Sequence, residues 1–560
     1  SNEYNRIYYA SFYDDPSKPM TDPDYDKTIV LVPESKDDVL RYEEENERDR
    51  NWYIEGKLNW DRSFGPKGQH KVSAMFLYNQ SRDYYPRYST GETSTYQYIP
   101  HSYVGFVGRA TYNYKGKYLA DFSIGYNGSE NFAPGKTRYG AFPSGSVGWV
   151  ISEEPFMETQ NFISYLKLRA SLGKVGNDLG STRFMYMPTV WVSNGGYSFG
   201  ETNPNMAEAY GEGVAGNDGV TWETAVKQNY GIDAEFLRSR LSLNLDLFFE
   251  HRSGILLKPN NTPSIISMTL PSLNIGEVNN HGYEVSLGWR DKTKGGFEYF
   301  ATANVSFARN KIIYMDEIES EFPWQNQTGG SVGRYTGLYK FVRLYQYSDF
   351  TEGPDGSLIL NPELPQPSSQ VYPGDAMYED ISGDGIVNGD DKMVTGYSTI
   401  PEYVFGLNAG FNFKGFNFSM QWTGATNVNK LMDLEYRIPY TNAGGRGLLE
   451  YFYEDGWTVE NQDGTLPRAA ETSEVWNSEP STLWLRDASY LRLKTVTFGY
   501  TFPGKGWLKA VGVKSLNISF SGYNLLTFTG LDFIDPESLT DRNGAYPLVK
   551  IYSLGLNLTF

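Results

Sequence analysis

The 560-residue sequence contains no cysteine and only four histidines. Without cysteine there can be no disulfide framework, no thiol nucleophile and no thiolate metal site. The histidines are far apart and form no HExxH motif, which leaves a zinc site without support. The sequence also lacks any run of about 20 apolar residues, so it excludes a membrane-spanning helix. The four histidines are His70, His101, His251 and His281.

The chain lacks an excess of basic residues as well, because its formal net charge is −18 at pH 7. This balance argues against a nucleic-acid partner, which would need a basic footprint on the protein. No secretory signal peptide is recognisable, and the chain begins at Ser1 without a methionine. We expect the numbered chain to be a mature, cleaved or partial piece of a protein.

Aromatic residues and glycine are abundant, with 44 Tyr, 32 Phe, 12 Trp and 58 Gly. Aromatic residues favour strands and glycine favours turns, so the composition indicates an all-β protein. The clearest strand is the last stretch, Tyr552–Phe560. Its even positions carry Tyr, Leu or Phe, and its odd positions carry Ser, Gly, Asn or Thr. Such a strand is expected to lie within a sheet or to close one, because an open apolar edge invites aggregation.

About 15 segments show the same alternation, and many of them are near 10 residues long. Strands of ordinary soluble sheets are usually about 5–6 residues long. Leu241–Glu250 is the clearest internal example, and Gln228–Phe236 is its expected hairpin partner. Short turns such as 238–240 and 414–415 alternate with long polar loops, which is the pattern of an outer-membrane barrel. The long loops are 198–225, 315–330, 349–400 and 428–486.

The expected fold is therefore an all-β, transmembrane antiparallel β-barrel whose apolar side chains face lipid. Residues 1–51 are expected to form an extracellular segment that enters the barrel, and residues 52–560 the barrel itself. A secreted β-sandwich or β-propeller would have a similar composition. Strand length, loop asymmetry and the terminal aromatic favour the barrel instead. Polar residues expected to line its lumen include Asn244, Asp246, Asn412, Gln421 and Asn517.

Five stretches resemble, in the same order, segments of the SusC/RagA family of TonB-dependent outer-membrane transporters. The most recognisable begins DASYLRLK at Asp487 and continues to Gly499-Tyr500 and Pro503. Each motif alone is modest in specificity, but five in order form a resemblance over most of residues 52–560. The five stretches are Lys117–Phe156, Asn274–Glu284, Asp487–Pro503, Gly522–Thr527 and Leu554–Phe560.

The resemblance implies an active importer in the outer membrane, with no bond-breaking chemistry. It implies TonB as the periplasmic partner, a SusD-like lipoprotein on the extracellular mouth, and oligosaccharides or oligopeptides as cargo. It also implies a barrel of about 22 strands, of which this chain would supply the C-terminal part. The family's small N-terminal domain, TonB-contacting segment, plug domain and first strands are not recognisable here. On this interpretation the chain alone would neither close the barrel nor contact TonB.

A calcium-loop motif lies at Asp380–Asp391, within the long loop 349–400. Oxygen-bearing residues stand at positions 1, 3, 5 and 12, with Gly385 at the sharp turn of position 6. Such a ligand set suits Ca²⁺ or Mg²⁺ in a structural role, and the family commonly has a similar string here. An acidic, glycine-rich turn without an ion is the alternative. The predicted metal ligands are Asp380, Ser382, Asp384, the backbone oxygen of Ile386, and Asp391.

Three other patterns are weak indications of a catalytic or cargo-binding site. Gly329–Gly333 matches the G-x-S-x-G elbow of hydrolases, but a polar loop precedes it and a strand-like segment follows it. The adjacent acids Glu153 and Glu154 would point to opposite faces of a strand. Aromatic residues in the long loops could stack on cargo or could form the girdle of a barrel. These aromatic residues are Trp324, Tyr335, Tyr339, Tyr451, Phe452, Tyr453 and Trp457.

Two functions from other classes remain open at this point. A secreted glycan-active enzyme would need carboxylates that converge in a cleft. A passive porin or adhesion barrel would transport or bind without TonB. The residues themselves do not identify the cargo or the side chains that contact it.

Overall fold

The structure is a computed structural model of the 560-residue chain. The chain divides into two compact units, of which the first comprises Ser1–Trp52 with Arg82–His101 and the second Tyr53–Ser81 with Ser102–Phe560. The described residues are 8–12, 29–33, 50–84, 99–135, 137–178, 183–188, 192–199, 205–211, 213–260, 270–432, 434–437, 439, 448–469, 476–531, 534–538 and 548–560.

The first unit contains a strand pair where we predicted an extracellular segment. Strand β1 (Tyr8–Phe12) pairs antiparallel with β2 (Ile29–Pro33). The first break between the units, at Trp52, is one residue from the predicted start of the barrel. The charged tract of residues 37–47 lies outside the described residues.

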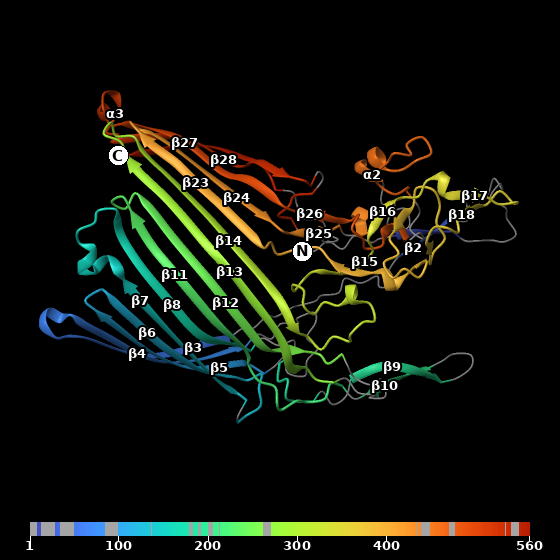
Figure 1. The fold of residues 1–560 in the computed structure, drawn as a ribbon, viewed down its shortest axis with the longest axis horizontal. Helices are drawn as coiled ribbons and strands as arrows, with labels where there is room; N and C mark the ends of the chain where they lie inside the picture. The colour runs from blue at the N-terminus through green and yellow to red at the C-terminus, as the bar shows by residue number, and fades with distance from the viewer. Residues whose placement is uncertain are drawn as a thin grey trace. The chain divides into compact units, whose positions relative to one another are not determined.

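Most of a 15-stranded sheet belongs to the second unit, and its strands confirm the number of alternating segments expected from the sequence. The strands lie side by side in chain order, with short turns at one end and long connections at the other (Figure 1). In order they are β3 (Arg50–Phe64), β4 (His70–Tyr84), β5 (His101–Tyr114), β6 (Tyr118–Ser129), β7 (Tyr139–Val150), β8 (Ile163–Asn177), β11 (Glu223–Phe236), β12 (Leu241–Leu257), β13 (Leu273–Lys292), β14 (Glu298–Tyr314), β23 (Tyr403–Phe413), β24 (Phe416–Thr426), β27 (Tyr490–Pro503), β28 (Ser515–Thr529) and β29 (Ile551–Thr559).

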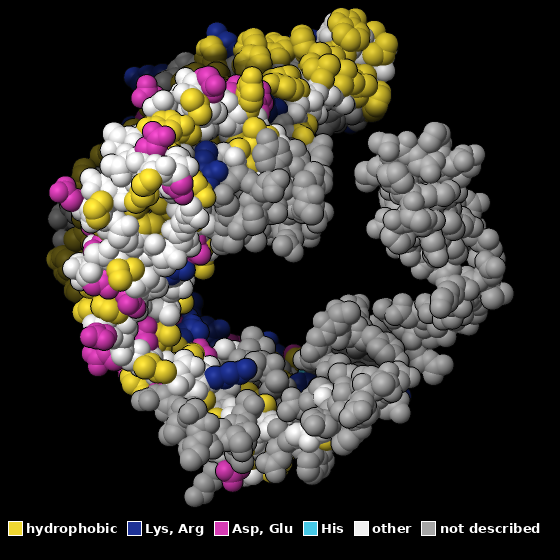
Figure 2. Space-filling model, turned by 90° about the vertical axis from the view of Figure 1, so that its right-hand side faces the viewer, with side chains coloured by type: hydrophobic (Ala, Val, Ile, Leu, Met, Phe, Trp, Pro, Cys, Tyr) yellow, Lys and Arg dark blue, Asp and Glu magenta, His cyan; other side chains and the backbone are white. Residues whose placement is uncertain are grey.

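Alternating side chains give this sheet one apolar face and one polar face, as period-2 strands must. On the apolar face, Leu247 lies opposite Tyr230 and Tyr283 on the two neighbouring strands. Leu247 is 42% exposed and Leu556 is 65% exposed, so these apolar side chains point into the surroundings and not into a protein core. Hydrophobic side chains gather at the upper edge of Figure 2, the side on which β27 and β28 lie in Figure 1.

Short turns join the strands at one end of the sheet. Between β23 and β24 only Lys414 and Gly415 are left unpaired, with φ of 47° and 91°. Positive φ at both central residues is what a two-residue type I′ hairpin requires, and glycine adopts it without strain. At the other end, β13 reaches 20 residues and β12 continues to Leu257, past the predicted end at Glu250.

The long loops differ from the prediction in two places. The predicted loop 198–225 begins inside strand β9 (Val192–Phe199), includes β10 (Asn205–Gly211), and ends inside β11, which starts at Glu223. The loop 349–400, which we predicted to be simply polar, helps to enclose a hydrophobic core. That cluster, here called the loop core, comprises Tyr339, Tyr345, Phe350, Val371, Ala376, Met377, Tyr378, Val387 and Trp476.

The loops contain only short elements among the residues that are described. The strands are β15 (Tyr335–Leu338), β16 (Phe341–Leu344), β17 (Phe350–Glu352), β18 (Leu358–Leu360), β19 (Gln366–Pro367), β20 (Ala376–Tyr378), β21 (Ile386–Val387), β22 (Met393–Thr395), β25 (Asn429–Leu431) and β26 (Leu485–Asp487). The α-helices of the loops and turns are α1 (Leu434–Arg437), α2 (Glu450–Asp455) and α3 (Trp507–Ala510). The 3₁₀ helices are η2 (Pro66–Gly68), η3 (Ile151–Glu153), η4 (Pro155–Met157), η5 (Pro323–Gln325), η6 (Tyr347–Asp349), η7 (Gly389–Asp391) and η8 (Trp476–Ser478).

In the part of the chain that the structure covers, none of the helices combines the length and the apolar character needed to cross a membrane.

The two faces predict opposite responses to a new charge. We expect Leu247→Arg to destabilise the protein in lipid by about 2–4 kcal/mol, because it places a cation on the apolar face of the sheet. Asn244→Arg on the polar face of the same strand is the matched control and should change stability by less than about 1 kcal/mol. Unfolding of both variants by urea in phospholipid vesicles measures the difference. Equal losses from the two substitutions would contradict the assignment of the faces.

Candidate functional site on the polar face and at its loop end

An arginine-centred cluster crosses three strands on the polar face. Arg169 of β8 donates two hydrogen bonds to Asp246 of β12, at 2.5 and 2.6 Å. Its Nε donates to Asp233 of β11 at 3.2 Å, and Nη1 donates to Asn229 at 3.2 Å. One guanidinium thus compensates two carboxylates, which is the arrangement that a partly buried charge needs.

Gly231 of β11 lies beneath this guanidinium. Because Gly231 has no side chain, Arg169 can reach across β11 to Asp246. Gly231 is opposite Arg169 on one side and Asp246 on the other. A Cβ at Gly231 would come within 2.3 Å of the Arg169 Cζ atom. The glycine is therefore needed for space and not for an unusual backbone angle.

A cavity of about 1080 Å³ lies where the polar face meets the long loops, and we call it the mouth cavity. Its wall is the loop end of β11 to β14, represented by Glu223, Arg252, Asn280 and Asn310. Two loop segments cover it, 329–334 and 396–402. A cavity of this size with convergent polar groups is the default candidate for a binding site.

Most charges in the mouth cavity are arranged in pairs. Arg252 donates to Glu223 at 2.7 Å and to Glu250 at 2.9 Å. Arg309 donates to both carboxylate oxygens of Glu402, at 2.8 and 2.6 Å. The cavity therefore offers hydrogen-bond donors and acceptors without a large field of one sign, which suits a polar and largely neutral ligand.

The loop core fixes the long loops over this end of the sheet. The rings of Tyr339 and Tyr378 stack with centroids 4.8 Å apart. The Tyr378 hydroxyl donates to the backbone oxygen of Trp476 at 2.9 Å. Burial raises the pKa of Tyr339 and of Tyr345 to about 12, so both phenols stay neutral near neutral pH.

The loop aromatics singled out in the sequence mostly pack in loops. Tyr339, Phe452 and Trp457 are buried, so the girdle interpretation is wrong for these three. Trp324 donates its Nε1–H to the backbone oxygen of Asp390 at 2.9 Å. These contacts make the buried aromatic residues part of the structure that holds the loops, whereas Tyr453 is exposed.

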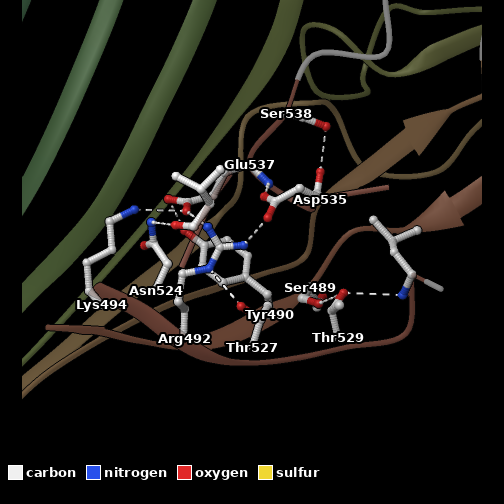
Figure 3. A network of polar contacts seen from close by, with 12 residues as sticks. Ser489, Tyr490, Arg492, Lys494, Asn524, Thr527, Thr529, Asp535, Glu537 and Ser538 are labelled. Atoms are coloured by element: carbon white, nitrogen blue, oxygen red, sulfur yellow. Dashed lines mark hydrogen bonds and ion pairs between the residues drawn. The ribbon is translucent and has the colours of Figure 1, made fainter. Parts of the chain in front are cut away.

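A second arginine fastens the connection between β28 and β29 to the polar face (Figure 3). Arg492 of β27 is fully buried and donates to Asp535 at 2.6 Å. It also pairs with Glu537, to which Lys494 donates at 3.0 Å. Because two acids of one short segment share this arginine, removing it would leave both without their main partner.

The predicted metal loop is closed by hydrogen bonds of its own. Asp391 is fully buried, and its carboxylate accepts the backbone N–H groups of Ile381, Ser382 and Asn388, each at 2.9 Å. Asp384 accepts the N–H of Ile386 at 2.8 Å. Position 12 of the motif is therefore the buried anchor of the loop.

Asp380 has the same role at the start of the loop. It accepts the backbone N–H groups of Gly383 at 2.7 Å and Gly385 at 2.9 Å, and the hydroxyl of Ser382 at 3.1 Å. Burial acts to raise the pKa of Asp380, but these hydrogen bonds outweigh it and keep the pKa below its usual value. Within the described ranges, three or more Asp, Glu or His side chains do not converge as they would on a metal ion. The bound ion therefore stays a prediction.

The remaining sequence motifs lie in turns and loops. Ser331 of the G-x-S-x-G match donates to the backbone oxygen of Asn310 at 3.0 Å and borders the mouth cavity. Glu153 and Glu154 are not on a strand as we had supposed, because η3 ends at Glu153. Glu154 accepts from Trp149 Nε1 at 3.1 Å and from Lys117 at 3.3 Å, which fastens one short turn to the next.

Sequence reasoning predicted Asp246 on the polar face but missed its arginine partner and the mouth cavity. A signal existed for the first, since Arg169 and Asp246 lie on polar positions of segments that both alternate clearly. No local pattern predicts the cavity, because Arg309 and Glu402 are 93 residues apart.

The antiparallel sheet has long strands, one apolar and one polar face, short turns at one end and large loops at the other. These are the features of the wall of an outer-membrane β-barrel. The chain belongs to the TonB-dependent receptors of the SusC/RagA type, since the family described as "TonB dependent receptor-like, beta-barrel" matches residues 1–525. The chain is accordingly a protein of the outer membrane.

The similarity extends to curated proteins and to solved structures. TonB-dependent receptor P26 of Formosa agariphila is 30% identical, over 83% of this chain and 47% of that protein. TonB-dependent receptor SusC of Bacteroides thetaiotaomicron is 25% identical, over 90% of this chain and 49% of that protein. The RagAB peptide importer in its open-open state has the same fold, with a TM-score of 0.68 at 19% identity over 92% of this chain and 55% of that one. The chain thus spans about half the length of the curated relatives it matches.

The arginine cluster provides a test by double mutation. Arg169→Ala and Gly231→Ala should each destabilise the barrel by about 1–3 kcal/mol, the first by unpairing two carboxylates and the second by displacing the guanidinium. In the Arg169→Ala background, Gly231→Ala should be close to neutral because the clash is gone. Unfolding free energies of the single and double variants give the coupling. Additive effects would show that Gly231 does not accommodate Arg169.

Proposed function

We propose that the whole protein imports nutrient oligomers across the outer membrane, using energy delivered through TonB. One observation supports this most directly: the polar face carries fixed, paired charges and ends in the mouth cavity on the loop side. A lipid-facing wall with such an inner side surrounds a polar passage. The membership in a transporter and receptor family supports the same function.

The cargo we propose is an oligosaccharide or an oligopeptide. Both carry many hydrogen-bonding groups and little net charge, which matches the paired acids and bases of the mouth cavity. The structure titled RagAB peptide importer, which has the same fold, supports a peptide cargo. The two cargo classes remain alternatives.

The partners we propose are TonB on the periplasmic side and a SusD-like lipoprotein over the loop end. The long loops form a folded layer around the loop core, which provides a stable surface for a lid. Among the described residues, β3 and β29 are the two ends of the sheet order. We propose that further strands, up to about 22, and a plug domain complete the barrel in the whole protein.

We propose further, from the sequence motif, that Ca²⁺ or Mg²⁺ binds at Asp380–Asp391 and stiffens this loop. The donors would be the side-chain oxygens of Asp380, Ser382, Asp384 and Asp391 with the backbone oxygen of Ile386. The role would be structural, because the hydrogen bonds of Asp380 and Asp391 already give the loop its course.

Uptake by cells tests the proposed transport. Cells that produce the whole protein and its lipoprotein partner should accumulate labelled oligosaccharides or oligopeptides, and deletion of TonB should abolish the accumulation. Cells without the transporter measure the background. Uptake that survives the loss of TonB would favour a passive porin, and hydrolysis of the cargo by the purified protein would favour an enzyme.

Calorimetric titration tests the proposed ion. Ca²⁺ should give a saturable heat with the wild-type protein, and Asp384→Ala should weaken binding at least about 10-fold by removing a charged ligand. Asp355→Ala, in the same long loop but outside the motif, is a control that should leave the titration unchanged. Equal heats from wild type and Asp384→Ala would remove the ion from this loop.

A further inference from the structure

The short-turn end of the sheet is basic, although the chain as a whole has a net charge of −18. The segments that join consecutive strands at this end carry ten Lys and Arg residues against three Asp and Glu residues. The basic residues are Lys67, Lys115, Lys117, Arg238, Arg240, Lys294, Lys414, Lys505, Lys509 and Lys514, and the acidic ones are Glu153, Glu154 and Glu158.

The turn between β27 and β28 concentrates this charge in a hollow. The hollow has a volume of about 460 Å³ and is lined by Lys505, Lys509, Lys514, Val513 and glycine backbone. No acidic residue stands anywhere between Ala488 and Leu531. The neighbouring strands β24 and β29 also contain no Asp or Glu. Among the described residues, no ion pair involves these three lysines, so their ammonium groups can bind an anion from outside the protein.

The turn has its own fixed structure. Leu508 and Val513 are buried and pack with Leu516 of β28. The backbone N–H of Lys514 donates to the oxygen of Thr559 at 2.7 Å, which ties the turn to β29. At the other side of the turn, a Cβ at Gly504 would lie 2.4 Å from the Lys514 oxygen, so the two ends of the turn lie in close contact. The lysines are thus carried on a folded turn and not on a loose loop.

Apolar side chains project beside the lysines. Trp507 is 69% exposed and Val511 is 63% exposed. The adjoining apolar face of β27 to β29 continues with Phe498, Ile518 and Leu556, all exposed. Tryptophan next to lysine at the edge of an apolar surface is typical of the membrane–water interface. α3 lies at the short-turn end of the sheet beside the C-terminus, away from the long loops (Figure 1).

We propose that this turn is a binding site for the phosphate headgroup of an anionic phospholipid in the periplasmic leaflet. Short turns of such barrels face the periplasm, so the hollow opens toward the headgroups of that leaflet. Lysine binds phosphate as a point charge and donates up to three hydrogen bonds. The acyl chains would lie along the apolar face of β27 to β29, next to Trp507. This inference rests on the membrane location of the chain and does not depend on the cargo.

Native mass spectrometry of the detergent-solubilised protein tests the site. Phosphatidylglycerol should bind in preference to phosphatidylcholine. The variant Lys505→Gln/Lys509→Gln/Lys514→Gln should weaken phosphatidylglycerol binding by about 100-fold, from roughly 1 kcal/mol for each lysine near an anionic surface. Trp507→Ala should weaken both lipids by a similar factor, because the indole contacts the interface and not the charge.

A matched variant separates this site from the general basic character of the turns. Lys67→Gln/Lys115→Gln/Lys294→Gln removes the same charge from other turns at the same end and should retain most phosphatidylglycerol binding. Equal losses from the two triple variants, or equal binding of the two lipids by the wild type, would overturn the proposal. Competition by inorganic phosphate at the same concentration as the lipid would also overturn it, since the site would then bind the free ion.

Discussion

The constraint on which this structure depends is that hydrocarbon offers no hydrogen-bond partner to a peptide group. Every N–H and C=O that crosses the membrane has to be paired within the protein, and a sheet achieves this only through long unbroken ladders between neighbours. The antiparallel order from β5 to β29 follows from that requirement, since each strand can pair with the next across a turn. About 9–11 residues suffice to cross the bilayer. The 20 residues of β13 therefore extend well beyond it.

These extensions connect the membrane wall with the proposed binding site. Arg252 and Asn280 lie near the loop ends of β12 and β13, on the polar face, where they border the mouth cavity. The same ladder that satisfies the backbone in lipid thus carries polar side chains into the loop layer on a rigid support. A site built on strand ends is held more precisely than one built on loops alone.

Much of the fold could be predicted because the information for it is local. Alternation along Leu241–Glu250 is visible in ten consecutive residues, and it fixes both the strand and its lipid-facing side. The confirmed number of strands and the hairpin at Lys414–Gly415 come from the same kind of signal. Strand ends were less accurate, since pairing with a neighbour extends β12 beyond the region of alternation.

The parts that sequence reasoning missed depend on contacts between distant segments. Tyr339 and Trp476 are far apart in the chain, and neither lies in a periodic pattern, so a polar-looking loop concealed a hydrophobic core. Gly231 gives no sign in the sequence that it makes room for Arg169, because glycine is frequent throughout the chain. Arg492 lies within a recognisable family motif, yet its acidic partners Asp535 and Glu537 lie in a later loop without any pattern.

Charge is distributed differently in the three parts of the wall, and the differences follow from what each part faces. On the polar face and in the mouth cavity, arginines are matched by carboxylates, because an unpaired charge in a partly desolvated passage would be costly and would retain ions of opposite sign. At the short-turn end, Lys505, Lys509 and Lys514 have no acidic residue on their own turn or on the strands beside it. These lysines are stabilised most where the surroundings supply negative charge. A leaflet of anionic headgroups does so, and Trp507 at the edge of the apolar face marks the depth at which it would.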